Sequence, residues 1–295
     1  MQIFLTGATG SIGSAVLRQT LAAGHRVTAL ARTESTASQL ARNGALPVLG
    51  DIAQPESWIN DAATADAFIH LANTFDDAMQ RIEPRLLAAL FAQTAKRQTP
   101  LRFLYTGGCW LFGATRGLHP ATEDSPLNPI SAFAWAAEAI ESLKNRPGLN
   151  TAILHPAMVY DTTGGVFSRM LTALRRGRPA PIWGEESITW PLVHRDDAAA
   201  AYLTLLDNPD ATGPHIVVAQ PRVKLGQIAA TLHAQAGLKT RPAVLPRRVA
   251  LAQHGAWAEG PMLSQALVST RMPALGWRPK HTDFSRLTYD IGQRA

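Results

Sequence analysis

A loop of three glycines near the amino terminus, Gly7-Ala-Thr-Gly10-Ser-Ile-Gly13, constrains the fold of this chain more than any other feature. It joins segment 2–6, which has the apolar residues of a strand, to segment 11–23, which has the apolar periodicity of a helix. In this setting Gly7 permits a tight turn, Gly10 lets the backbone approach a pyrophosphate, and Gly13 lets the helix lie close to the sheet. The free N–H groups at the start of the helix then point at the phosphates. The sequence therefore predicts a dinucleotide site made from Gly7, Thr9, Gly10, Ser11, Ile12 and Gly13.

Strand-like and helix-like segments continue to alternate after this loop. We expect strands at 26–31, 45–49, 67–71, 101–106 and 151–155, and helices at 35–43, 55–62, 76–97 and 131–144. Pro84 is expected to kink or restart the third of these helices. Such alternation predicts an α/β fold with a doubly wound parallel sheet, the NAD(P)-binding Rossmann fold.

The pattern loosens after residue 160, where glycine and proline become frequent, and it resumes with a predicted helix at 196–206 and a strand at 215–218. From about residue 224 helical segments are punctuated by Pro242, Pro246, Pro261 and Pro273. We therefore expect residues 1–160, joined by 191–220, to form the dinucleotide-binding core. Residues 161–190 and 221–295 are expected to form a smaller, mostly helical lobe that binds substrate.

The end of the second predicted strand distinguishes two forms of the dinucleotide. An acidic residue there would bind the ribose 2′-hydroxyl of NAD, whereas an arginine can accommodate the 2′-phosphate of NADP. Arg32 stands at that position, and Glu34 comes two residues later. We therefore expect NADP(H) to be preferred over NAD(H); a solvated surface charge is the alternative interpretation of Arg32.

Composition argues against several other classes of protein. The net charge is +6, but the basic residues are scattered, so we expect no nucleic-acid partner. The single cysteine, Cys109, and nine dispersed histidines argue against a disulfide framework and a metal site. No apolar run approaches the ~20 residues that span a bilayer, and no signal peptide is recognisable. We expect a cytoplasmic protein without a membrane partner.

Several further segments resemble those of the extended and atypical short-chain dehydrogenase/reductase superfamily, in its NAD-dependent epimerase/dehydratase-like branch. They are Gly50-Asp51-Ile52, His70-Leu71-Ala72, the stretch 155–160 (HPAMVY), the stretch 191–197 (PLVHRDD) and the stretch 275–279 (LGWRP), in the family's order. The resemblance covers nearly the whole chain. It implies cofactor contacts from Asp51, Ile52, Leu71, Ala72, Thr106, His155, Pro156 and Met158.

The catalytic motif of that superfamily is missing. Its reductases and epimerases use a serine or threonine and a Tyr-x-x-x-Lys, in which the lysine lowers the pKa of the tyrosine. Gly107 and Gly108 occupy the serine positions, and alignment puts Ile130 and Ala134 where the tyrosine and lysine belong. Three explanations stay open. Other groups could replace the relay, the reaction could need little proton transfer, as in hydride delivery to an iminium, or the cofactor could bind without turnover.

Candidate replacements lie near the ends of later strands. Tyr160 and Thr106 are the candidate catalytic residues, although each could be structural. Aromatic residues in loops at the carboxyl ends of strands predict an apolar substrate pocket, from Trp110, Phe112, Trp183 and Trp190, with Trp135 and Phe167 nearby. The expected activity is NADP(H)-dependent oxidoreductase or epimerase-like chemistry on a small apolar or aromatic carbonyl- or imine-type metabolite. A non-catalytic NADP(H)-binding regulator or scaffold is the alternative. The resemblance also suggests a homodimer through helices 76–97 and 131–144.

Overall fold

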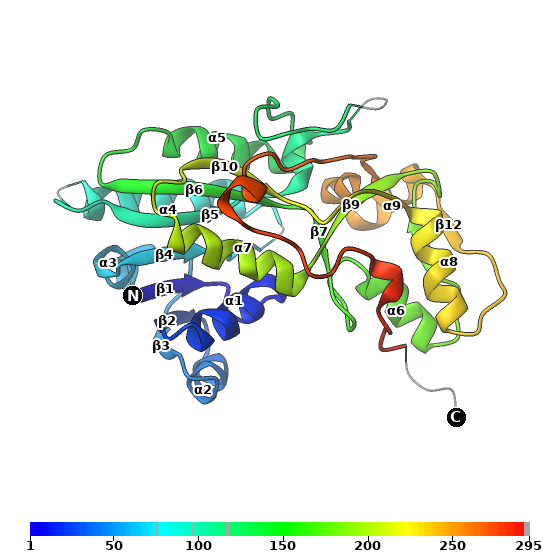
Figure 1. The fold of residues 1–295 in the computed structure, drawn as a ribbon, viewed down its shortest axis with the longest axis horizontal. Coiled ribbons are helices and arrows are strands. Elements are labelled where there is room, and N and C mark those ends of the chain that lie inside the picture. The colour runs from blue at the N-terminus through cyan, green and yellow to red at the C-terminus, as the bar shows by residue number, and fades with distance from the viewer. Residues whose placement is uncertain (75, 96, 116–118, 292–295) are drawn as a thin grey trace.

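A seven-stranded parallel sheet forms the core of the computed structural model, which describes residues 1–74, 76–95, 97–115 and 119–291 (Figure 1). Its order is β10-β6-β5-β4-β1-β2-β3. The strands are β1 (Gln2–Thr6), β2 (Arg26–Ala31), β3 (Leu46–Leu49), β4 (Ala67–His70), β5 (Leu101–Thr106), β6 (Leu149–Pro156) and β10 (Gly213–Val217). The chain runs outward from β1 to β3 and then returns to β4 on the other side of β1. This reversal leaves a crevice at the carboxyl ends of β1 and β4, where open α/β sheets bind ligands.

Helices cover both faces of this sheet. Helix α1 (Ser11–Ala22) packs with α7 (Arg195–Asp207) over one face, and α4 (Met79–Thr94) packs with α5 (Ala134–Leu143) over the other. Because successive strand residues point to opposite faces, Ile3 and Leu5 join one buried cluster while Phe4 joins the second. The remaining helices of this part are α2 (Glu34–Arg42) and α3 (Ile59–Thr64).

The predicted doubly wound parallel sheet is confirmed, with element ends that shift by a few residues. The long helix begins at Met79 rather than at residue 76, and it continues through Pro84 without a restart. Segment 131–144 divides into a 3-10 turn, Ser131–Phe133, followed by α5. Segment 55–62 likewise divides into the turn Pro55–Ser57 and α3.

The second half of the chain contains two small sheets that the expectation of a mostly helical lobe did not include. One is β11-β9-β7 and the other β12-β8. Their strands are β7 (Met158–Tyr160), β8 (Pro181–Trp183), β9 (Thr189–His194), β11 (Gln220–Lys224) and β12 (Ala243–Leu245). Most of these strands are short, so the alternation of apolar and polar residues along them is too brief to predict a strand from the local sequence. They also pair across long sequence separations.

Helices α6 (Ser168–Arg175), α8 (Leu225–Gln235) and α9 (Arg247–His254) gather around these sheets at the end of the molecule farthest from β3 (Figure 1). Segment 191–220 contributes α7 and β10 to the main fold, whereas β9 joins the small sheet. The division into core and lobe stays a prediction. No helix in the described part of the chain is long and apolar enough to cross a membrane.

Candidate functional site

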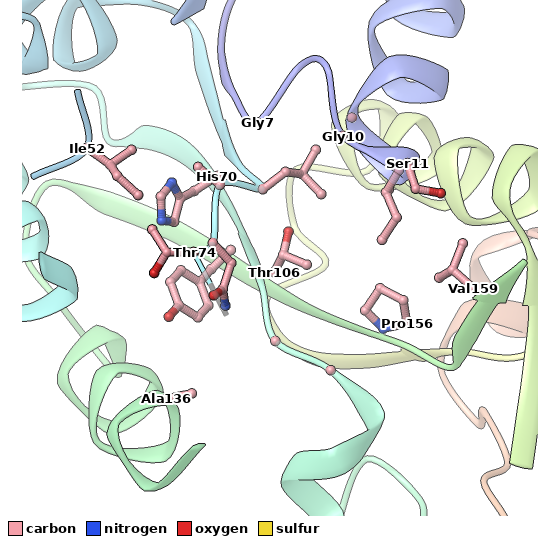
Figure 2. A pocket seen from close by; sticks show the side chains of 18 of the residues that line it. Gly7, Gly10, Ser11, Ile52, His70, Thr74, Thr106, Ala136, Pro156 and Val159 are labelled. Atoms are coloured by element: carbon pink, nitrogen blue, oxygen red, sulfur yellow. The ribbon is translucent and has the colours of Figure 1, made fainter. Parts of the chain in front are cut away.

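A cavity of about 980 Å³ lies at the carboxyl ends of the strands, beside the reversal between β1 and β4 (Figure 2). Its wall is built by the glycine loop, by the residues that follow β4, β5 and β6, and by the start of α5. In Figure 2, Gly10 and Ser11 lie on one side of it, His70 and Thr74 on another, and Ala136 faces it from α5. One space therefore adjoins both the predicted phosphate loop and the predicted reaction site.

The glycine loop is shaped by close backbone contacts. Gly7 has a φ of +73°, and a Cβ there would lie 2.7 Å from the carbonyl carbon of Leu71. A Cβ on Gly13 would lie 2.0 Å from the Gly7 oxygen, so α1 can begin beside the loop only without a side chain at that position. Gly10 caps α1 without a side-chain hydrogen bond, and no acidic residue lies in the first turn. The first N–H groups of α1 can therefore bind an anion.

Most of the predicted cofactor residues line this cavity. They are Gly7, Thr9, Gly10, Ser11, Ile12, Gly13, Arg32, Ile52, Leu71, Ala72, Thr106, Pro156 and Met158. Arg32 is exposed at the end of β2, and Thr36 lines the cavity beside it. These lining positions agree with the sequence prediction, while the contact of each with a cofactor stays a prediction.

Asp51 and His155 are the exceptions, because neither lines the cavity. The Asp51 carboxylate accepts a hydrogen bond from the N–H of Ala53 at 2.9 Å. His155 is buried, its ring packs edge-on against Phe112, and burial lowers its pKa to about 4. It is the neighbour Pro156, on the opposite side of the strand, that lines the cavity. His155 is buried and therefore has a structural role, whereas a cofactor contact from the partly exposed Asp51 stays a prediction.

The two candidate catalytic residues have different surroundings. Thr106 lines the cavity, and its hydroxyl is 2.8 Å from the hydroxyl of Tyr202. Tyr160 is fully buried, packs against Phe167 and His194, and does not line the cavity. Its hydroxyl has no hydrogen-bond partner in the described part of the chain, and burial raises its pKa. The prediction that Tyr160 donates to substrate is therefore wrong: the alternation of β7 puts Val159 in the cavity wall and Tyr160 in the core.

Of the four predicted pocket aromatics, only Trp110 lines the cavity. Phe112 lies against His155. The ring of Trp183 stacks on the ring of His254 at 4.4 Å between centroids, and the guanidinium of Arg169 lies over it. Trp190 donates a hydrogen bond from Nε1 to the backbone oxygen of Pro261. Phe112, Trp183 and Trp190 are therefore packing residues rather than pocket residues. The aromatic wall consists of Trp110, Phe133 and Trp135.

The start of α5 carries no group that could act as the missing relay. Ile130 and Ala134, which alignment places at the tyrosine and lysine positions, do not line the cavity; Phe133, Trp135 and Ala136 do. None of these side chains has a hydroxyl or an amine. Lys144, at the far end of the helix, is exposed and pairs with Glu141.

Among the polar lining residues that the sequence prediction did not assign to the site, three are buried: His70 from β4, Glu83 from α4 and Tyr105 from β5. The His70 Nδ1 lies 2.7 Å from the Thr6 hydroxyl, and its Nε2 lies 3.3 Å from Oε2 of Glu83. Burial and the neighbouring Glu83 carboxylate raise the pKa of Tyr105 well above its ordinary value. A signal was present in the sequence, since Glu83 falls on the apolar face of the predicted helix, where a charged residue is rarely buried without a reason.

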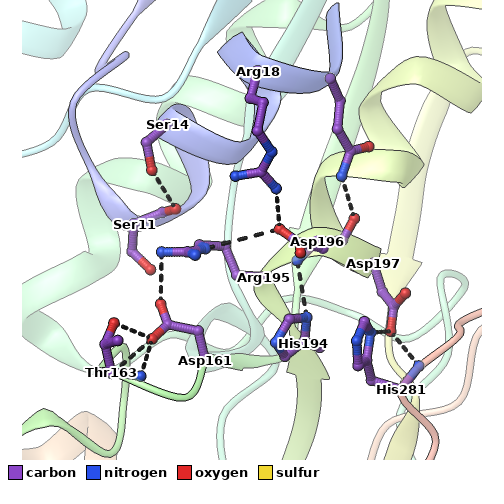
Figure 3. A network of polar contacts seen from close by, with 12 residues as sticks. Ser11, Ser14, Arg18, Asp161, Thr163, His194, Arg195, Asp196, Asp197 and His281 are labelled. Carbon is purple, nitrogen blue, oxygen red and sulfur yellow. Dashed lines mark hydrogen bonds and ion pairs between the residues drawn. The ribbon is translucent and has the colours of Figure 1, made fainter. Parts of the chain in front are cut away.

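A second polar network lies where the core meets the later part of the chain (Figure 3). Arg195 pairs with Asp161 at 2.9 Å, and Arg18 of α1 pairs with Asp196 at 2.5 Å. Asp197 accepts hydrogen bonds from the backbone N–H groups of Lys280 and His281. The family-like segment 191–197 therefore fastens α1, α7 and the carboxyl-terminal segment together. Among the described residues, no group of three His, Cys, Asp or Glu side chains could hold a metal ion.

Comparisons with known proteins agree with this architecture. A sequence model of the NAD dependent epimerase/dehydratase family matches residues 3–219. An uncharacterised protein of Schizosaccharomyces pombe is 25% identical over 306 residues, covering 100% of this chain and 99% of that protein.

Two solved structures share the fold. A double mutant of DesIV, the dTDP-glucose 4,6-dehydratase of Streptomyces venezuelae with NAD bound, superposes with a TM-score of 0.81 at 18% identity, covering 99% of this chain and 96% of its own. The human epimerase family protein SDR39U1 with NADPH has a TM-score of 0.78 at 20% identity and 97% coverage of both chains. Because the family match spans most of the chain, the protein belongs to the NAD dependent epimerase/dehydratase family, for which NAD(P) is the typical cofactor.

Proposed function

We propose that this protein binds NADP(H) in the cavity and transfers a hydride between its nicotinamide and a small apolar or aromatic substrate of the carbonyl or imine type. The observation that carries the proposal is the continuity of one cavity from the glycine loop to the aromatic wall. A nicotinamide dinucleotide is extended, so its phosphates and its reactive ring would need these two ends at once.

The preference for NADP(H) rests on the end of β2. Arg32 and Thr36 line the cavity there, and no carboxylate lines this end. Two acids line the described part of the cavity wall: Asp76 lies just before α4, and Glu83 lies within α4. A guanidinium binds a phosphate in a charge-assisted, bidentate manner, whereas a ribose hydroxyl gains little from it. The NADPH in the human relative with the same fold is consistent with this preference.

The class of substrate rests on the opposite end. Trp110, Phe133 and Trp135 line it, and the start of α5 has no phenol or amine. Apolar and aromatic ligands suit such a wall. Reactions that need no strong proton donor, such as hydride transfer to an iminium, suit the missing relay. A homodimer through α4 and α5 stays a prediction.

The cofactor preference can be tested with Arg32→Ala. We expect its affinity for NADPH to fall about tenfold or more, because a desolvated phosphate contact contributes over 1.4 kcal/mol, while affinity for NADH changes less than about twofold. Arg42→Ala, which removes a basic side chain from the last turn of α2, the helix that follows Arg32, is the matched control. Equal losses for the two cofactors would contradict the proposed 2′-phosphate contact.

Activity is tested by following the absorbance of NADPH with a panel of aromatic and alicyclic ketones, aldehydes and cyclic imines. Oxidation of NADPH that depends on one of these substrates supports the proposal. Tight NADPH binding with no turnover across the panel would contradict the enzymatic part and favour the regulator alternative. A pull-down of partner proteins that changes between NADP⁺ and NADPH would then identify that role.

A further inference from the structure

Glu83 is a buried carboxylate with an unused oxygen beside the cavity. It is 1% exposed and shares a face of α4 with the buried Met79 and Leu87. Its Oε2 lies 3.3 Å from His70, but its Oε1 makes no hydrogen bond within residues 1–74, 76–95, 97–115 and 119–291. An unpartnered buried carboxylate oxygen costs free energy, so its presence in a cavity wall indicates a ligand that satisfies it.

His70 has a hydrogen-bond partner at each ring nitrogen, Thr6 at Nδ1 and Glu83 at Nε2. The Thr6 hydroxyl oxygen accepts from the N–H groups of Leu71 at 3.3 Å and Ala72 at 3.4 Å. Its own hydrogen is therefore free to be donated to Nδ1 of His70, 2.7 Å away. When Nδ1 of His70 accepts from Thr6, its Nε2 carries a proton and donates to Oε2 of Glu83, which leaves Oε1 as the carboxylate oxygen without a hydrogen-bond partner among the described residues.

No other side chain of the cavity wall supplies a counter-charge. The Tyr105 hydroxyl hydrogen-bonds with the Glu83 carboxylate, and because burial and this carboxylate raise the pKa of Tyr105 well above its ordinary value, the phenol is neutral. Arg32 is the one arginine among the described lining residues, none of which is a lysine, and it lies at the end of β2, on the other side of the sheet reversal. Asp76, the second acid of the wall, is exposed and accepts from Thr74 and Ala78. Glu83 is therefore the one buried acid among the described lining residues, and Trp110, Phe133 and Trp135 line the same cavity.

We propose that Glu83 recognises a cationic nitrogen of the substrate, an iminium ion or the protonated amine that corresponds to it. This inference rests on the proposed hydride transfer and names its substrate class. A buried carboxylate pairs with such a nitrogen by charge and hydrogen bonding, and aromatic faces attract the same cation. The site would select against neutral ketones of the same shape, because these leave the carboxylate unpaired.

This substrate class accounts for the missing relay. The iminium carbon accepts a hydride from the reduced nicotinamide and forms a new C–H bond. The electron pair of the C=N π bond moves onto nitrogen, which becomes a neutral amine, while the nicotinamide takes the positive charge. Atoms and electrons balance without a proton donor, so neither a tyrosine nor a lysine is required on α5. Glu83 stabilises the cation before transfer and afterwards binds the amine that water protonates.

The experiment measures binding to the protein loaded with NADP⁺, so that no turnover is needed. Calorimetry compares cations with neutral partners of equal shape: benzylammonium with benzyl alcohol, cyclohexylammonium with cyclohexanol, and dihydroisoquinolinium with tetralone. We expect at least one cation to bind about tenfold more tightly than its neutral partner. In Glu83→Gln, which keeps the volume and removes the charge, this ratio should fall below about twofold while NADPH affinity is unchanged.

Glu141→Gln, the same substitution at an exposed position of α5, is the matched control and should keep the preference. Absence of a cation preference in every pair, or its survival in Glu83→Gln, overturns the inference. The first of these is measured on the unmodified protein, so it holds even if the variant fails to fold. If NADPH itself does not bind, the proposed function fails instead, and the two failures are thus distinguished.

Discussion

The two ends of the cavity are built in different ways. At the glycine-loop end the wall is one short stretch, Gly7 to Gly13, and the groups proposed to bind phosphate are backbone N–H groups at the start of α1. At the aromatic end the wall is assembled from β4, α4, β5, the turn at 109–112 and α5, and the groups proposed to bind substrate are side chains. The first end needs glycines at set spacing, whereas the second needs distant residues brought together by packing.

This difference bears on how substitutions would affect the two ends. Backbone N–H groups are present whatever the side chains, so the proposed phosphate binding requires only that Gly7 and Gly13 permit the close backbone contacts. Side-chain chemistry changes with single substitutions, and the start of α5 carries neither a phenol nor an amine.

The largest effect should come from the glycine loop. In Gly13→Ala the new Cβ would meet the Gly7 oxygen at 2.0 Å, so α1 or the loop must move. We expect NADPH affinity to fall about 100-fold and the free energy of unfolding to fall by about 3 kcal/mol, as measured by calorimetry and urea titration.

Gly108→Ala is the matched substitution for stability, because a Cβ there meets nothing within 4 Å and φ is extended at 173°. Its free energy of unfolding should stay within about 0.5 kcal/mol of the parent. Equal losses of stability in the two variants would show that the close approach at Gly13 has no special role, and would weaken the contrast between the two ends.

An intermediate effect on stability is expected from substitution of His155, which is buried next to the lining residue Pro156 and does not itself line the cavity. Burial lowers its pKa from 6.5 to about 4, so the unfolded chain binds more protons than the folded one between these values. Its contribution to stability is thus present above pH ~6.5 and is lost as the pH falls toward 4, by up to about 3 kcal/mol.

His155→Gln, which cannot titrate, should show a flatter decline in unfolding free energy over this range, measured by urea titration at several pH values. Since His194 and His215 also have lowered pKa values, the difference between variant and parent is the informative quantity. The exposed His119→Gln should leave the profile unchanged. A parallel decline in the His155 variant would contradict a buried neutral histidine.

The smallest effect should come from Tyr160, because its hydroxyl is buried without a partner. We expect Tyr160→Phe to keep any turnover and to raise the free energy of unfolding by up to about 1 kcal/mol. Tyr202→Phe removes a hydroxyl that is bonded to Thr106, so it should instead cost about 1 kcal/mol. A large loss of turnover in Tyr160→Phe, with folding intact, would restore this phenol as a catalytic candidate.

The parts of the site that could be predicted from sequence are those that depend on neighbours along the chain. The glycine loop, Arg32 at the end of β2, and Ile52, Leu71 and Ala72 after their strands all line the cavity as expected. In a parallel sheet, a residue just past the carboxyl end of a strand lies at the ligand-binding edge wherever the strand is placed. The position of each strand in the sequence is then sufficient to predict that these residues line the cavity.

The direction of a side chain near a strand end was harder to predict, because a shift of one residue turns it to the other face. The predictions for His155 and Tyr160 were wrong for this reason, since each is buried beside a residue that does line the cavity. The prediction that Trp183 and Trp190 line the pocket was wrong for a different reason. Their partners, among them Arg169, His254 and Pro261, come from segments whose pairing no local sequence pattern indicated.

The sequence by itself determined the parallel sheet, the phosphate loop and the absence of a tyrosine–lysine pair on α5, since each depends on residue type and spacing within a short segment. Only the tertiary structure brought Glu83, His70 and Tyr105 together, from α4, β4 and β5, and showed that one carboxylate oxygen has no partner in the described part of the chain. Such a group exists only once strands and helices pack, because burial and hydrogen bonding are properties of the folded surroundings and not of the residue.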